Sequence, residues 1–181
     1  VQDRWGDPVD PEKVSAAIQA NPNAKVLAFV HAETSTGVRS DAKQLCQLAK
    51  AAGMLTIVDA VTSLAGIDLM VDAWGADVVY SGTQKCLSSL PGIAPITFSP
   101  DAVAAITSRT HKVQSWFLDM NLIMGYWGEG AKRAYHHTAP VNAIYALHES
   151  LLMLEEEGLL KSFARHLSLI HISEPTRPRS I

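Results

Sequence analysis

The sequence has 181 residues, of which 48% are hydrophobic and 18% are charged, and its formal net charge is −3. This composition is typical of a soluble globular domain with a real core, and its slight acidity argues against a protein that binds nucleic acid. No apolar run reaches the roughly 18 residues that cross a membrane. Because Cys46 and Cys86 lie far apart in the sequence, we expect no disulfide framework and a reducing, cytoplasmic setting.

The first half of the chain alternates predicted helices with predicted strands. Asp10-Pro11-Glu12 starts a helix with a capping acid and a proline at the first position. The next predicted elements are a strand at 25–30, a polar loop at 31–37, an amphipathic helix at 40–52 and a strand at 54–58. The first strand is apolar throughout, which is expected when helices cover both faces of a sheet. The alternation predicts right-handed crossovers and a largely parallel sheet.

The second half begins with shorter elements. In order, the sequence predicts an extended piece at 67–70, a helix at 71–74, a strand at 78–80, a loop to 92 and a strand at 94–98. We expect the last strand to return antiparallel, because too few residues intervene for a helical crossover. Further helices are predicted at 100–108, 116–124 and 140–157.

Asp59 and Lys85 are the first candidates for chemistry. Each follows the carboxyl end of a predicted parallel strand, where open α/β sheets bind their ligands. Taken alone, a lysine is most often a solvated surface charge, and an aspartate here could be a helix cap or loop anchor. Together they suit a carbonyl cofactor held as a Schiff base. The lysine would supply the imine nitrogen, and the acid would pair with a protonated ring nitrogen.

Four motifs, in the same order along the chain, resemble the class V pyridoxal-phosphate aminotransferases, and within them the alanine/serine–glyoxylate aminotransferase group. The motifs are H-A-E-T-S-T-G-V at 31–38, V-D-A-V-T-S at 58–63, Y-S-G-T-Q-K at 80–85 with L-P-G at 90–92, and Y-H-H-T-A-P at 135–140. The similarity covers about Val1 to His166. It implies an α/β fold, namely part of a fold-type I large domain with a mostly parallel sheet flanked by helices.

The resemblance also assigns roles to residues of the first three motifs. Lys85 would carry pyridoxal 5′-phosphate as a Schiff base and move the proton during the reaction. Asp59 would pair with the pyridine nitrogen, and Val61 would pack against one face of the ring. Thr34 stands where the family often has a serine, near the phenolic oxygen of the ring. Gln84 would hydrogen-bond the phosphate.

The fourth motif implies a homodimer with shared active sites. In the family, the positions of Tyr135 and Thr138 reach the cofactor phosphate of the neighbouring subunit. The implied substrates are an amino acid donor, alanine or serine, and a 2-oxo acid acceptor, glyoxylate. The family's phosphate-cradling loop, ring-stacking aromatic and carboxylate-binding arginine fall outside the matched positions. We therefore expect this chain by itself to bind the cofactor poorly and to turn over little.

Several alternatives stay open at this point. The chain could belong to another enzyme of the same class, such as a ureidoglycine aminotransferase or a lyase, or be a non-catalytic α/β fragment. A nucleotide-binding domain is disfavoured because no G-x-G-x-x-G follows a strand. His31-x-Glu33 resembles half of a zinc deaminase signature, but no P-C-x-x-C follows, so we expect no metal. We expect loop hydrogen bonding for His136-His137 and a packed thiol for Cys86.

The C-terminal segment changes character abruptly. Residues 167–181, LSLIHISEPTRPRSI, resemble the translation of a sequencing adapter. We therefore expect a partial cofactor-binding domain at 1–166 and a non-native or disordered tail at 167–181.

Overall fold

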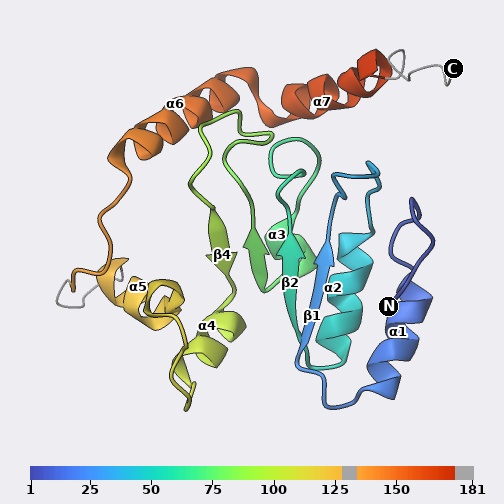
Figure 1. Cartoon of the computed structure of the whole chain (residues 1–181). Helices are drawn as coiled ribbons and strands as arrows, with labels where there is room; N and C mark the ends of the chain where they lie inside the picture. Colours follow the sequence, from blue (N-terminus) through green and yellow to red (C-terminus); the bar gives the residue numbers. More distant parts are fainter. Residues whose placement is uncertain (128–133, 174–181) are drawn as a thin grey trace, which may run out of the picture.

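The structure is a computed structural model of the chain, and it describes residues 1–127 and 134–173, with Trp127 and the last four of these by their backbone alone (Figure 1). Four strands form one sheet in the order β1-β2-β3-β4. They are β1 (Val26–Val30), β2 (Leu55–Asp59), β3 (Val78–Tyr80) and β4 (Ile96–Phe98). β1, β2 and β3 are parallel, and β4 pairs with β3 in the antiparallel direction. The mostly parallel sheet and the reversed last strand are as the sequence predicts.

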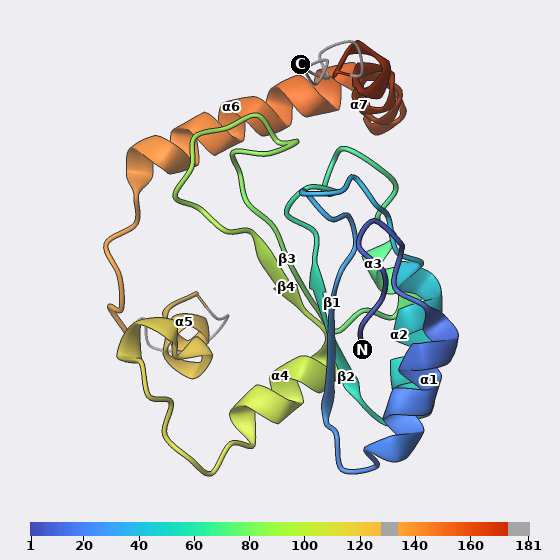
Figure 2. The same cartoon turned by 45° about the vertical axis from the view of Figure 1, so that its right-hand side comes forward.

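Three helices cover one face of this sheet: α1 (Pro11–Ala20), α2 (Ala42–Ala51) and α3 (Val71–Trp74) (Figure 2). Asp10 caps α1 by accepting hydrogen bonds from the amides of Glu12 and Lys13, and Asp41 caps α2 at the amide of Gln44. The helices bury a stripe of small and branched side chains against the strands. In α2 these are Ala42, Leu45, Cys46 and Ala49.

The two faces of the sheet differ in what covers them. Val58 and Val79 pack with Cys46 in the core on the helical side. Because side chains alternate along a strand, Asp59 and Tyr80 point to the other face. On that side the described chain places α4 (Pro100–Thr107) beside β4, with α5 (Met120–Trp127) farther from the sheet (Figure 2).

Helices therefore lie on both sides of the sheet, as the predicted fold class has it, but in the described chain they cover the two faces unequally. Val26 and Ile96, at the two ends of the open face, are 45% and 48% exposed. An apolar strand shows that both of its faces are apolar, but it does not show what lies against them.

The remaining elements are η1 (Trp116–Leu118, a 3₁₀ turn), α5 (Met120–Trp127), α6 (Val141–Glu157) and α7 (Leu159–Ser173). The single helix predicted at 116–124 is in fact two pieces. The backbone is extended at Asp119, whose carboxylate accepts from the amide of Asn121 and so starts α5. The extended piece predicted at 67–70 pairs with no strand of the sheet.

α6 and α7 pass over the loops at the carboxyl ends of the parallel strands (Figure 1). α7 continues across Leu167, where the sequence changes character, as far as Ser173. Whether residues 167–181 are native stays a prediction. Among the described helices, none combines the length and the apolar character needed to cross a membrane.

Candidate active site

Three loops meet at the carboxyl edge of the sheet, one after each parallel strand. They carry Thr34 after β1, Asp59 and Val61 at the end of β2, and Gln84 and Lys85 after β3. Since β1, β2 and β3 are neighbours and parallel, these five predicted site residues lie at the same edge.

Side-chain hydrogen bonds join these loops. The hydroxyl of Thr62 donates to the carbonyl of Ala32 at 2.6 Å, which links the loops after β2 and β1. The thiol of Cys86 donates to the carbonyl of Thr62 at 3.5 Å, which links the lysine loop to the turn after Asp59. The loops are therefore held to one another as well as to their strands.

Asp59 ends β2 with both of its carboxylate oxygens engaged. Oδ1 accepts a hydrogen bond from the amide of Val61 at 2.9 Å, and Oδ2 accepts one from the hydroxyl of Tyr80 at 2.7 Å. Asp59 and Tyr80 are register partners on neighbouring strands. The hydrogen bond to the carboxylate, with some burial, raises the pKa of the Tyr80 phenol to about 12, so that the hydroxyl stays protonated near neutral pH.

Hydrogen bonds from two hydroxyl side chains hold the backbone of the lysine loop in place. The hydroxyl of Ser81 donates to the carbonyl of Ala60 at 3.0 Å, and the buried Thr83 donates to the carbonyl of Ile93 at 3.2 Å. By contrast, the side chains of Gln84 and Lys85 are exposed and make no hydrogen bond or ion pair with the described residues. The loop thus presents an unengaged primary amine on a backbone that is held in place.

Cys86 is a packed thiol, as the sequence predicts. Burial raises the pKa of Cys86, which keeps the sulfur in its less reactive protonated form. Gly66 makes room for it, since a Cβ atom at Gly66 would lie 2.6 Å from the sulfur. Burial likewise raises the pKa of Cys46 to about 11.

Tyr135 and Thr138 lie elsewhere. Their segment, between α5 and α6, lies apart from the β3–β4 connection that carries Lys85 (Figures 1 and 2). The two hydroxyls form a hydrogen bond with each other, and Tyr135 is 73% exposed. The structure therefore does not bring these two predicted residues to the carboxyl edge of their own sheet.

The histidine motifs have ordinary structural surroundings. His31 is buried and its ring packs edge-on against Trp74, and this burial lowers its pKa. The carboxylate of Glu33 accepts hydrogen bonds from the amide and hydroxyl of Ser35. His136 contacts the ring of His137 and the carbonyl of Trp116. Over residues 1–127 and 134–173 there is no group of three or more His, Cys, Asp or Glu suited to a metal ion.

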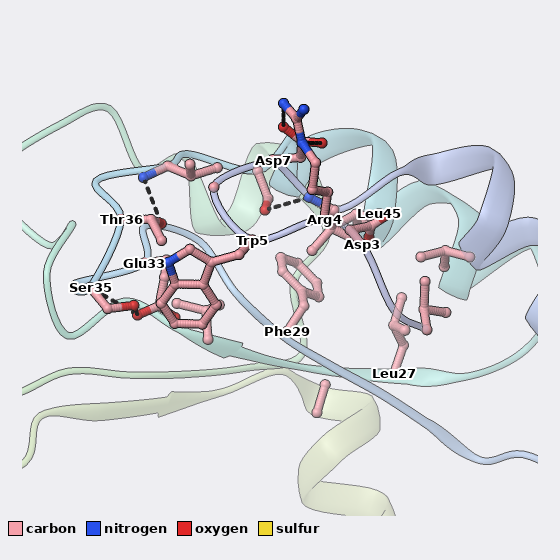
Figure 3. A pocket seen from close by; sticks show the side chains of 18 residues that line it. Asp3, Arg4, Trp5, Asp7, Leu27, Phe29, Glu33, Ser35, Thr36 and Leu45 are labelled. Carbon is pink, nitrogen blue, oxygen red and sulfur yellow. Dashed lines mark hydrogen bonds and ion pairs between the residues drawn. The ribbon is translucent and has the colours of Figure 1, made fainter.

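A cavity of about 550 Å³ lies at the free edge of β1, on the far side of that strand from β2 (Figure 3). It is lined by the N-terminal segment, including Arg4 and Trp5, by Leu27 and Phe29 of β1, and by the loop after β1. Neither Asp59 nor Lys85 lines it. Its lining residue Arg4 is already paired with Asp7, and the lining includes no lysine, so the carboxyl edge of the sheet is the better candidate site.

The sequence profile of the family described as Aminotransferase class-V matches residues 6–174. The chain belongs to the class V aminotransferases. It is similar to alanine–glyoxylate aminotransferase from Oryctolagus cuniculus, with 43% identity over 142 residues, which are 78% of this chain and 36% of that protein.

Solved structures agree with this assignment. Alanine–glyoxylate aminotransferase from Nostoc sp. has 42% identity and a TM-score of 0.88, over 95% of this chain and 45% of that one. Ureidoglycine–glyoxylate aminotransferase from Bacillus subtilis has 37% identity and a TM-score of 0.86, over 92% and 42%. These similarities confirm the predicted family and fold class. This class V aminotransferase chain spans less than half the length of each of these relatives.

Two residues of the site were not predicted. Tyr80 and Thr62 lie within the recognised motifs, yet the motifs alone indicate no role for either residue. The contact of Tyr80 with Asp59 follows from strand register, because the two residues directly oppose each other at the ends of β3 and β2. Aligning the carboxyl ends of β3 and β2 would have placed Tyr80 opposite Asp59.

Proposed function

We propose that this chain is the cofactor-binding part, residues 1–166, of a pyridoxal 5′-phosphate-dependent aminotransferase that passes an amino group from alanine or serine to glyoxylate. The observation that carries the proposal is the pair at the carboxyl edge: the Asp59 carboxylate, held by two donors, and the unengaged amine of Lys85 one strand away. Membership of the class V family and similarity to proteins named for glyoxylate transamination support it.

The residues present fit the proposed cofactor. Each oxygen of Asp59 accepts one hydrogen bond and keeps a second lone pair, so the carboxylate can still accept from a protonated ring nitrogen. Val61, whose amide binds Asp59, lies beside that position. Gln84 and Thr34 are exposed at the same edge and offer an amide and a hydroxyl for the phosphate and the phenolic oxygen. When bound, pyridoxal 5′-phosphate supplies an electron-accepting ring that stabilises negative charge on the substrate Cα.

Lys85 has two tasks in this proposal. Its Nζ atom would hold the aldehyde carbon of the cofactor, which requires an amine free of competing partners. With a substrate bound, the same Nζ atom would take the proton from the substrate Cα as a general base. The Asp59 carboxylate would receive the ring nitrogen, which favours the protonated and more electron-accepting ring.

The proposal includes a homodimer in a cytoplasmic setting. Tyr135 and Thr138 lie away from Lys85 of their own chain and are accessible, which suits a role at the phosphate of a second copy. Trp116 and Phe117, which contact His137, are also largely exposed and would be covered in a dimer. The two free cysteines suit a reducing compartment. Sedimentation equilibrium tests the dimer directly.

Covalent labelling tests the site. The chain is mixed with pyridoxal 5′-phosphate, reduced with borohydride and mapped by peptide mass spectrometry. We expect the label mainly at Lys85, and we expect it to disappear from that peptide in Lys85→Arg but to persist in the matched control Lys43→Arg, on α2. Equal labelling of the exposed lysines would contradict the proposal.

The reaction is tested in a chimaera with the Nostoc enzyme, which is longer than the matched region. Residues 6–166 would replace the corresponding segment of the Nostoc enzyme, and amino donors would be compared with glyoxylate as acceptor. We expect activity with alanine or serine, reduced by about 10²–10⁴-fold or more in Lys85→Ala because the proton transfer is lost. The similarity to the Bacillus subtilis protein favours ureidoglycine as a second candidate donor, and the same panel decides between them. A chimaera whose activity survives Lys85→Ala would exclude the proposal.

A further inference from the structure

Tyr80 ends β3 directly opposite Asp59, and both side chains point to the open face of the sheet. Its hydroxyl donates to Oδ2 of Asp59 at 2.7 Å. The raised pKa of this phenol, about 12, means that the hydroxyl carries its proton across the physiological range and acts as a donor to the carboxylate. The contact is therefore a charge-assisted hydrogen bond between neighbouring strands.

A second donor, the amide of Val61, fixes the orientation of the Asp59 carboxylate. The amide of Val61 donates to Oδ1, so the two oxygens of Asp59 are held by different donors. Rotation of the carboxylate about its Cβ–Cγ bond would break both hydrogen bonds. The lone pairs that remain on the two oxygens consequently point in fixed directions, which a carboxylate with one donor would not ensure.

The position of Tyr80 in the chain adds a further constraint. Its carbonyl accepts from the amide of Ala60, and the next residue, Ser81, donates its amide to Pro95 and its hydroxyl to Ala60. Tyr80 is thus fixed on both sides, and the same segment continues into the loop that carries Lys85. The orientation of Asp59 is tied through Tyr80 to the strand that carries the amine.

We infer that Tyr80 is a positioning residue: its hydroxyl holds the Asp59 carboxylate in the orientation that receives the ring nitrogen of the cofactor, and it acts through Asp59. The inference rests on the proposed function for the identity of the cofactor. The hydrogen bond itself and its effect on Asp59 do not depend on that proposal. Tyr80→Phe removes the hydroxyl and keeps the ring, and Tyr145→Phe, at an exposed tyrosine on α6, is the matched control.

The first measurement uses the 181-residue chain without cofactor. With tyrosine labelled at the ring carbon that bears the oxygen, NMR follows the Tyr80 phenol, which we expect to titrate near pH 12 and to move toward its ordinary pKa in Asp59→Asn. Hydrogen exchange of the Val61 amide should quicken several-fold in Tyr80→Phe and stay unchanged in Tyr145→Phe. An ordinary phenol pKa together with unchanged exchange would overturn the inference.

The second measurement is a double-mutant cycle with pyridoxal 5′-phosphate as the probe. Tyr80→Phe should weaken its binding by about tenfold, the effect of losing one hydrogen bond to a charged group. In the Asp59→Asn background, Tyr80→Phe should change the affinity for pyridoxal 5′-phosphate by less than about twofold, because the carboxylate through which Tyr80 acts is absent. An equal effect in both backgrounds would show a merely structural tyrosine. Because we expect this chain by itself to bind the cofactor weakly, the titration extends to millimolar pyridoxal 5′-phosphate. If the wild-type chain forms no adduct at Lys85 even there, the proposed function fails, and the NMR measurements alone decide the role of Tyr80.

Discussion

Ser162 of α7 donates its hydroxyl hydrogen bond to the carbonyl of Ala65 at 2.7 Å, across 97 positions of the sequence. Ser162 is completely buried, and Ala65 has a φ of +67°, in the left-handed region. This contact attaches α7 to the turn that follows Asp59, and it gives the strained turn a partner that the local sequence does not provide.

Ser162→Ala should therefore destabilise the fold. The substitution leaves the buried carbonyl of Ala65 without its partner, which costs about 1–3 kcal/mol in the free energy of unfolding. Urea unfolding measures the change, and Ser108→Ala, at an exposed serine that ends α4, serves as the control with an effect within about 0.5 kcal/mol. Equal stability of the two variants would show that α7 does not hold the turn.

Asp77 should be a second point of sensitivity, at the opposite edge of the sheet. Its Oδ2 accepts from the amide and the hydroxyl of Thr56, and its Oδ1 accepts from the hydroxyl of Ser99, which caps α4. Asp77→Ala leaves the buried amide and hydroxyl donors of Thr56 without an acceptor, so we expect a loss of about 2–3 kcal/mol in the free energy of unfolding. Asp72→Ala, at an exposed aspartate in α3, is the control. If Asp77→Ala and Asp72→Ala destabilise the chain equally, the hydrogen bonds of Asp77 do not stabilise the fold.

Gly66 should tolerate no side chain while Cys86 is present. In Gly66→Ala the new Cβ atom would lie 2.6 Å from the sulfur, and overpacking of this kind costs about 1–3 kcal/mol. Adding Cys86→Ala should recover part of the loss, since the sulfur is then absent, although the Cys86 Cβ atom at 3.2 Å keeps the contact tight. Chemical unfolding of the four proteins of this cycle measures the coupling. Additive losses would mean that Gly66 and Cys86 do not compete for space.

Alkaline pH should destabilise the chain through Cys46. Burial raises its pKa from 9.0 to about 11, so the folded state holds this proton more tightly than the unfolded state. The resulting stability is complete below pH 9 and is lost as the pH rises toward 11, an effect on the order of 2 kcal/mol. Urea unfolding at several pH values should show a smaller decline between pH 9 and 11 in Cys46→Ala. If the free energy of unfolding of Cys46→Ala declines between pH 9 and 11 as steeply as that of the wild type, the Cys46 thiol is not the cause of the decline.

Local patterns explain what the sequence predicted well. The caps at Asp10 and Asp41 and the apolar stripe of α2 are short-range signals, and the brief connection before β4 leaves room only for an antiparallel return. The positions of Asp59 and Lys85 at the edge follow from strand ends, which are also local. The break at Asp119 was missed because apolar spacing continues across it.

Other features depend on residues that are distant in sequence. Tyr80 reaches Asp59 across 21 positions, and Ser162 reaches Ala65 from a helix that lies over the loops. The coverage of the sheet likewise depends on which segments pack against it, which strand composition alone does not encode. The assignment of Tyr135 and Thr138 to a neighbouring subunit stays a prediction.

Asp59 and Lys85 differ in how much freedom folding leaves them. The carboxylate has both oxygens bound, so its conformational entropy is lost when the chain folds. The lysine side chain retains rotamer freedom worth about 2 kcal/mol until something binds its amine. A ligand that binds both residues therefore finds the Asp59 carboxylate already ordered, and the entropy cost of binding comes from immobilising the Lys85 side chain alone.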